Sequence, residues 1–137
     1  MSAYDVVILG AGPGGYVAAL RAAQLGAMVC LIEKTTVGGT CLNRGCIPSK
    51  ALIHSAALWK RAHEGAAFGV TASNWTFDWG RAQGRKNEVV RAQVQGIGTL
   101  LGAAKVEVRQ GTASLVDART VKVSANGSAE TISAKAI

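Results

Sequence analysis

The sequence has 137 residues, 49% of them hydrophobic and 17% charged, which is typical of one packed domain and excludes a disordered chain. Its net charge of +7 comes from basic residues scattered between Arg21 and Lys135, without a run or interleaved aromatic residues, so a solvated surface is favoured over a nucleic-acid site. No stretch approaches the roughly 20 uninterrupted apolar residues of a membrane span, so no membrane association is expected.

Residues 1–34 carry the pattern of a β-α-β unit. The apolar, β-branched run over residues 4–9 predicts a buried parallel strand. A helix-forming run from Tyr16 stops at Gly26, where a left-handed cap is natural, and a second strand then ends at Glu33.

The turn after the first strand reads "GAGPGG", with Gly10, Gly12 and Gly15 at G-x-G-x-x-G spacing. The three glycines allow a tight turn, close approach of a pyrophosphate, and close packing of helix on strand. The helix N-terminus favours phosphate, and Glu33 can accept hydrogen bonds from ribose hydroxyls. Glu33 would repel a 2′-phosphate, so the sequence predicts FAD or NAD rather than NADP.

Two cysteines, Cys41 and Cys46, lie in the stretch "GGTCLNRGCIPSK". On a regular helix their α-carbons would be roughly 8 to 9 Å apart, beyond the roughly 7 Å limit of a disulfide, so a bond needs an irregular turn, which Gly45 can supply. Pro48 suits the first turn of the helix that follows. The helix N-terminus and Lys50, four residues after Cys46, both favour a thiolate.

Three roles for this cysteine pair remain open: redox exchange, metal binding and inert thiols. A structural disulfide over so short a loop removes little chain entropy, and zinc would need further ligands, whereas His54 and His63 are nine residues apart. The redox role is therefore favoured. Cys30, inside the second strand, is expected to pack in the core. So few cysteines indicate a reducing, cytoplasmic compartment.

The remainder of the chain predicts two further elements. Residues 78–104 carry an amphipathic helical stripe that includes Val90, Ile97 and Leu101. Residues 105–137 alternate with period two and turn at Asn126–Gly127, which predicts a small β-meander.

The stretches "VVILGAGPGGYVAALRAAQLG", "IEK" and "GGTCLNRGCIPSK" together resemble the FAD domain of the pyridine nucleotide-disulfide oxidoreductases. The resemblance covers essentially residues 1–137 and implies an α/β, Rossmann-like FAD-binding domain with a parallel sheet, helices and a small meander. Residues 38–64 would form its redox-cysteine helix. The residues around the cysteines are most similar to the branch that oxidises dihydrolipoyl groups, with the glutathione and mercuric reductase branches as alternatives.

The resemblance also implies residue roles. Cys41 would be the interchange thiol that meets the substrate, and Cys46 the thiol that faces the flavin. Lys50 would lie near the flavin N5, and backbone at Ala113 would lie against the adenine. The cofactor-binding residues implied are Gly10, Gly12, Pro13, Gly14, Gly15, Glu33, Lys34, Gly39, Thr40, Cys41, Lys50 and Ala113.

The activity implied is transfer of electrons from dihydrolipoamide through Cys41 and Cys46 to tightly bound FAD and then to NAD as co-substrate. The implied partners are lipoyl groups of 2-oxoacid dehydrogenase or related complexes and a second copy of the full-length protein, with no nucleic acid. Compared with the family, the chain is expected to be a truncated, N-terminal segment that is inactive alone. The alternative is a non-catalytic nucleotide-binding fragment.

Overall fold

The computed structural model describes residues 4–137, so residues 1–3 of the expected β-α-β unit lie outside the described residues. The elements in chain order are β1 (Tyr4–Leu9), α1 (Pro13–Gln24), β2 (Val29–Glu33), α2 (Gly39–Arg44), α3 (Cys46–Glu64), the 3-10 helix η1 (Gly65–Phe68), α4 (Trp79–Ala103), β3 (Glu107–Gln110), β4 (Thr112–Asp117), β5 (Thr120–Ala125) and β6 (Ser128–Ala136).

The strands form one six-stranded sheet in the order β3-β2-β1-β6-β5-β4. β1 pairs in parallel with β2 and β6, and β2 pairs in parallel with β3, whereas β4, β5 and β6 are antiparallel. The expected α/β fold with a parallel sheet is therefore confirmed.

The expected meander over residues 105–137 is wrong at its beginning. Residues Glu107–Gln110 form β3, which lies beside β2 with Leu31 opposite Val108. The meander contains only β4, β5 and β6. Period-two alternation marks an extended strand but carries no information about its partner, and the long α4 crossover returns the chain to the parallel part of the sheet.

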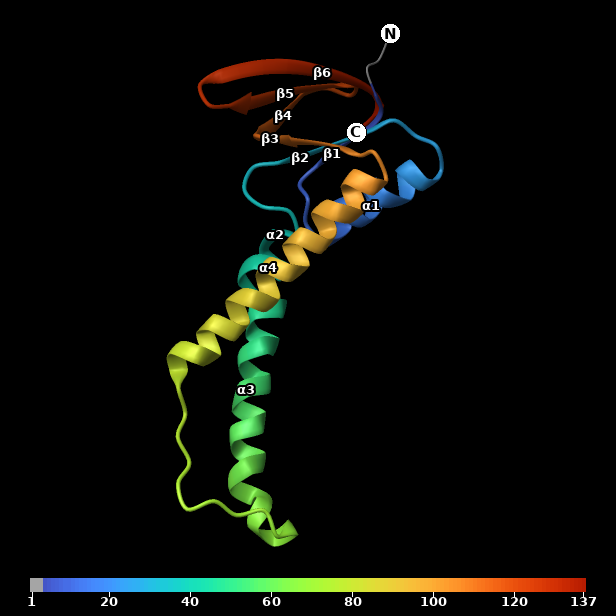
Figure 1. Cartoon of the computed structure of the whole chain (residues 1–137). Helices are drawn as coiled ribbons and strands as arrows, with labels where there is room; N and C mark the ends of the chain where they lie inside the picture. Colours follow the sequence, from blue (N-terminus) through green and yellow to red (C-terminus); the bar gives the residue numbers. More distant parts are fainter. Residues whose placement is uncertain (1–3) are drawn as a thin grey trace.

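Figure 1 shows α1 and α4 on one side of the parallel strands and the meander on the other, and a hydrophobic core lies on each side. On one face, α1 and α4 pack through Ala19, Ile97 and Leu101 against Val29 and Leu31 of β2. On the other face, the meander covers the parallel strands, and the residues of this core are Tyr4, Val7, Cys30, Ile32, Val121, Val123, Ile132 and Ala134. Residues of β2 are buried on both sides, which explains its continuous apolar sequence.

The residues at the N-termini of α1 and α4 explain where these helices begin. α1 begins at Pro13, earlier than the predicted Tyr16, because proline's fixed φ suits a first helical position and leaves one fewer unpaired N–H. α4 begins after Asp78, whose Oδ1 accepts a 3.0 Å hydrogen bond from the Arg81 N–H. Within residues 4–137, none of the helices has both the length and the apolar character that crossing a membrane requires.

α3 and the first half of α4 project away from the sheet as a helical hairpin (Figure 1). At its far end the rings of Trp59 and His63 lie 4.1 Å apart, and Phe77 meets Trp59 edge-on at 5.7 Å. These aromatic contacts hold the loop between η1 and α4 against α3, at the opposite end of α3 from the cysteines.

Candidate functional site

The glycine loop, residues 10–15, joins β1 to α1 and forms an open backbone cradle. Gly10 has a φ of +91°, and its N–H donates to the Ile32 carbonyl at 2.7 Å. A Cβ on Gly15 would collide with the Gly10 carbonyl oxygen, whereas Cβ positions on Gly12 and Gly14 face open space. The first N–H groups of α1 have no intrahelical acceptor, so the loop offers room and donors for a phosphate.

Glu33 ends β2 beside this loop and is only 6% exposed. Its Oε2 accepts from the Ala11 N–H at 2.8 Å, and its Oε1 accepts from the N–H and the hydroxyl of Thr35 at 2.8 and 2.9 Å. Burial raises the pKa of Glu33, but these hydrogen bonds outweigh burial and lower it, so the side chain is a carboxylate. Three of about four acceptor positions are filled, which leaves about one for a ligand hydroxyl.

A cavity of about 230 Å³ opens beside this carboxylate. The turn from β3 to β4 forms its far wall, because the Gly111 N–H donates to the Glu33 carbonyl at 2.9 Å. The predicted residues Gly10, Glu33, Lys34 and Ala113 therefore meet around one cavity, although Ala113 lies far along the chain from the others.

A second glycine turn lies against the first. The Gly38 N–H donates to the Ala11 carbonyl at 2.7 Å, and Gly39 has a φ of +60°. A Cβ on Gly39 would lie 2.7 Å from the Gly12 α-carbon, so a side chain there would separate the two turns. The predicted residues Gly39 and Thr40 thus lie next to the glycine loop, in a polar cavity of about 200 Å³ that Lys34 also lines.

Cys41 and Cys46 form a disulfide whose α-carbons are 4.9 Å apart. Cys41 lies within α2, and Cys46 is the first residue of α3. The predicted redox-cysteine helix over residues 38–64 is therefore broken at Gly45, which is the position expected to supply the irregular turn. A Cβ on Gly45 would lie only 3.2 Å from the Thr40 carbonyl oxygen, so glycine lets the two short segments approach.

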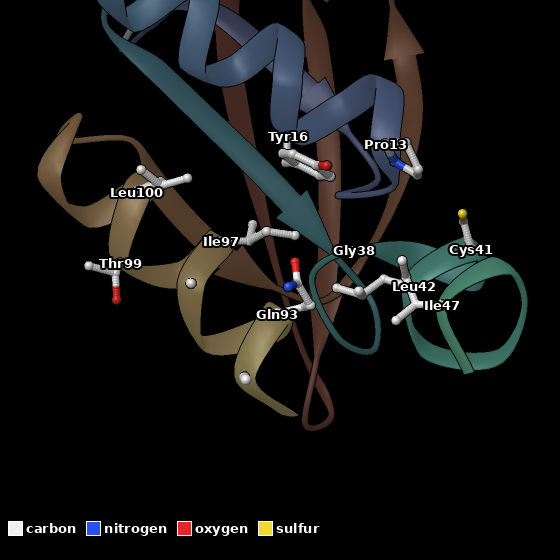
Figure 2. Close-up of a pocket in the computed structure, with 12 residues that line it drawn as sticks. Pro13, Tyr16, Gly38, Cys41, Leu42, Ile47, Gln93, Ile97, Thr99 and Leu100 are labelled. Carbon is white, nitrogen blue, oxygen red and sulfur yellow. The ribbon is translucent and has the colours of Figure 1, made fainter. Parts of the chain in front are cut away.

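A cavity of about 690 Å³ adjoins this disulfide, and we call it the disulfide pocket (Figure 2). Of the two cysteines only Cys41 lines it. Pro13 and Tyr16 come from α1, and Ile97 and Leu100 come from α4. The pocket therefore has one cysteine of the pair in a mostly apolar lining beside the glycine loop.

Lys50 lies outside these cavities. It is exposed on α3, four residues after Cys46, and lines a separate cavity of about 290 Å³ with His54 of the same helix and Arg85 of α4. The structure therefore groups Lys50 with other basic side chains rather than with the predicted cofactor residues of the glycine loop.

Thr35 and Asn43 take part in the site but were missed from the sequence. Thr35 follows Glu33 by two residues, a spacing at which a hydroxyl often bonds a neighbouring polar group, so a local signal existed. The Asn43 amide donates to the carbonyls of Val37 and Gly39, and no sequence pattern predicts that pair of bonds.

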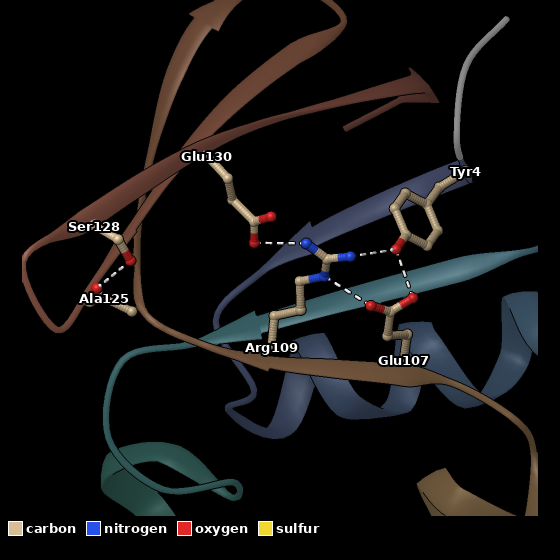
Figure 3. A network of polar contacts seen from close by, with 6 residues as sticks. All are labelled: Tyr4, Glu107, Arg109, Ala125, Ser128 and Glu130. Carbon is tan, nitrogen blue, oxygen red and sulfur yellow. Dashed lines mark hydrogen bonds and ion pairs between the residues drawn. The ribbon is translucent and has the colours of Figure 1, made fainter.

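A second group of polar side chains lies at the other end of the strands (Figure 3). Arg109 of β3 donates to Glu107 at 2.7 Å and to Glu130 of β6 at 2.5 Å, while the Tyr4 hydroxyl donates to Glu107. Hydrogen bonds from Tyr4 and Arg109 lower the pKa of Glu107. These contacts tie the meander to the parallel strands and are distant in the fold from the disulfide.

Among residues 4–137, no group of three or more His, Cys, Asp or Glu side chains is arranged to hold a metal ion. Cys30 is fully buried, and burial raises the pKa of its thiol to about 11. Its position in the core agrees with the packing role expected for it.

This fold and site define a dinucleotide-binding domain that carries a disulfide beside its phosphate cradle. The family model described as pyridine nucleotide-disulphide oxidoreductase matches residues 4–137. The chain belongs to that family.

Curated relatives and solved structures agree with this assignment. The chain is 47% identical over 131 residues to dihydrolipoyl dehydrogenase of Bacillus subtilis, covering 96% of this chain and 28% of the relative. It is 45% identical over 127 residues to the enzyme of the same name from Chlorobaculum parvum, covering 93% and 27%. The Cu(II) complex of the HOCl-induced flavoprotein disulfide reductase RclA from Escherichia coli superposes with a TM-score of 0.80 at 31% identity, covering 98% and 27%. The chain thus spans little more than a quarter of these relatives.

Proposed function

We propose that the full-length protein is an FAD-dependent dihydrolipoyl dehydrogenase, which oxidises dihydrolipoyl groups and passes the electrons to NAD. The observation that carries the proposal is the Cys41–Cys46 disulfide, held beside a glycine-rich loop with Cys41 in the lining of an apolar pocket. The similarity to dihydrolipoyl dehydrogenases over nearly the whole chain supports the choice of substrate.

Cys41 is the interchange cysteine in this proposal, because it lines the disulfide pocket and Cys46 does not. A substrate thiolate attacks the Cys41 Sγ, the bond to Cys46 breaks, and the Cys46 sulfur leaves as a thiolate. The second substrate thiol then attacks the substrate sulfur of the mixed disulfide and releases Cys41. The substrate dithiol has become a disulfide, and the protein disulfide has become a dithiol that holds the two electrons.

The residues present fit FAD. The open Cβ positions at Gly12 and Gly14 and the unpaired N–H groups of α1 suit its pyrophosphate, and the cavity between Glu33 and Ala113 suits its adenosine. When bound, FAD supplies a two-electron acceptor for the protein dithiol and a donor for NAD. Glu33 would hold a ribose hydroxyl of the cofactor with its remaining acceptor position.

Further residues complete the proposed cofactor site. Lys34, Gly39 and Thr40 line the polar cavity next to the glycine loop, and Pro13 shapes the entry to α1. Lys50 lines a different cavity from these residues, but it lies one helical turn beyond Cys46 on α3, where its positive charge would favour the Cys46 thiolate and would face the flavin ring in the proposed complex.

The proposed partners rest on the similarity to dihydrolipoyl dehydrogenases. The substrate dithiol is the lipoyl group carried by 2-oxoacid dehydrogenase or related complexes, and the full-length protein forms a homodimer in the cytoplasm. The apolar walls that Ile97 and Leu100 contribute to the disulfide pocket suit the hydrocarbon part of a lipoyl arm.

The test is turnover by the full-length protein and two single-cysteine variants. Cys41→Ser and Cys46→Ser should each abolish reduction of NAD by dihydrolipoamide, because neither variant can form the disulfide. Cys30→Ala, which removes the buried thiol outside the site, serves as the control and should keep turnover. Substantial dihydrolipoamide turnover by Cys41→Ser would refute the mechanism. Preference for glutathione disulfide or Hg(II) over lipoamide would refute the substrate.

A further inference from the structure

α2 carries Cys41 and has only six residues, too few for a helix to be stable alone. Its N-cap, Gly38, has no side chain with which to cap it. Leu42 anchors one side of α2 in the core below the sheet. Backbone contacts of Gly38 and Gly39 hold the start of α2 against the glycine loop, and the polar side chains of α2 supply the remaining contacts.

Asn43 makes such contacts. Its Nδ2 donates to the Gly39 carbonyl at 2.9 Å and to the Val37 carbonyl at 3.1 Å, so both amide hydrogens are used. Gly39 is the first residue of α2, so the bond to its carbonyl lies within the helix, whereas the bond to Val37 ties α2 to the turn before it. Within residues 4–137, no other side chain of α2 donates a hydrogen bond to that turn.

The segment that accepts these bonds, residues 37–39, rests on the glycine loop. Gly38 donates to the Ala11 carbonyl, and Gly39 lies against the α-carbon of Gly12. Asn43 lies two residues after Cys41 and three before Cys46. A continuous set of contacts thus runs from the glycine loop through the second turn and the Asn43 amide to the helix that carries Cys41.

We propose that Asn43 is a positioning residue for the Cys41–Cys46 pair. Its amide holds α2 so that, after reduction, the Cys41 sulfur stays within bonding range of Cys46. This preorganisation favours closure of the disulfide and opposes its reduction. The inference concerns only the thiol–disulfide equilibrium of this chain, so it stands whichever dithiol the protein oxidises.

Three substitutions of Asn43 remove these hydrogen bonds to different extents. Asn43→Ala removes both donors. Asn43→Asp keeps the shape but turns a carboxylate oxygen toward two carbonyls. Asn43→Ser retains one hydroxyl donor. Because a hydrogen bond contributes about 1 kcal/mol net, the dithiol form should gain about five- to tenfold in Asn43→Ala, at least as much in Asn43→Asp, and less in Asn43→Ser.

Val121→Ala is the matched control for a general loss of stability. Val121 is 1% exposed in the meander core, on the opposite face of the sheet from α4, and that core contains no residue of α2 and neither disulfide cysteine. This variant should lose stability without moving the thiol–disulfide equilibrium. Asn87→Ala, an exposed asparagine on α4, should change neither property.

The experiment uses the full-length protein, equilibrated anaerobically in mixtures of dithiothreitol and its cyclic disulfide. Reduction opens the Cys41–Cys46 bond to two thiols as one dithiothreitol closes to its disulfide. Acid quenching, alkylation and mass spectrometry then give the fraction of free Cys41. The proposal is supported if the midpoint shifts in the order Ser, Ala, Asp while Val121→Ala stays at the wild-type value. It is overturned if folded Asn43→Ala and Asn43→Asp remain within about twofold of wild type, or if Val121→Ala shifts equally.

Discussion

The Glu33 carboxylate accepts a 2.8 Å hydrogen bond from the backbone N–H of Ala11. This bond joins the end of β2 to the loop that follows β1, so the acid that lines the 230 Å³ cavity also holds the glycine loop in place. A change at Glu33 should therefore affect the fold and the proposed cofactor site together.

Glu33→Gln tests this double role. A glutamine can accept from only one side, and its NH₂ group would face either the Ala11 or the Thr35 N–H. We expect a loss of about 1–3 kcal/mol in the free energy of unfolding, because a buried donor loses its partner. FAD affinity of the full-length protein should fall in parallel, measured by fluorescence titration of the apoprotein. Glu88→Gln, an exposed change on α4, should leave both unchanged, and equal FAD affinity in Glu33→Gln would contradict the prediction.

Stability should fall in acid for a related reason. The pKa values of Glu33 and Glu107 are lowered in the folded protein from an ordinary value of 4.5. Their ionised forms thus stabilise the fold above that value, and this contribution is lost as the pH falls through the lowered pKa values. Urea unfolding between about pH 6 and about pH 3 should show the loss, with a shallower dependence in Glu33→Gln. An equally steep dependence in that variant would exclude Glu33 as a source.

Cys30 should be inert while the domain is folded. Burial raises the pKa of its thiol to about 11, and the side chain has no exposed surface. After mild reduction at about pH 8, iodoacetamide should therefore label Cys41 but not Cys30. Denaturation before labelling is the control and should make all three cysteines react. Labelling of Cys30 at the rate of Cys41 in the native protein would be the opposite result.

Two glycine-to-alanine changes should have opposite effects. Gly84 is inside α4 with open space around its Cβ position, so Gly84→Ala should stabilise the domain by about 0.5–1 kcal/mol through helix propensity. Gly15→Ala should destabilise it by about 1–3 kcal/mol, because the new methyl group meets the Gly10 carbonyl oxygen. Thermal unfolding of both variants should show a higher Tm for Gly84→Ala and a lower Tm for Gly15→Ala than for the wild type. A change of Tm in the same direction in both variants would contradict the prediction.

Much of the fold could be predicted because its signals are local. The apolar run of β1, the glycine spacing and the helical stripe of α4 each lie within one element and depend on its period alone. Gly45 could be identified as the break between the cysteines because helix geometry forbids a disulfide at their spacing.

The parts of the fold and site that the sequence did not predict depend on pairings between distant segments. Nothing in the sequence of β3 distinguishes a fourth parallel strand from the first strand of a meander, because its partner is selected by the α4 crossover. Likewise, the donors that surround Glu33 and the two carbonyls that Asn43 binds are backbone groups, which every residue has. Their identity appears only once the turns are packed together.

The pairing of β1 with β6 has a consequence for synthesis on the ribosome. Tyr4 lies opposite Ala134 and Val6 opposite Ala136, so strands from the two ends of the described chain are neighbours. Until β6 emerges, the nascent chain has no meander to cover the apolar face that includes Val7. Long-range strand pairing is slow to form and leaves such faces exposed in the meantime. The growing polypeptide is therefore expected to engage chaperones that recognise apolar segments until β6 is available.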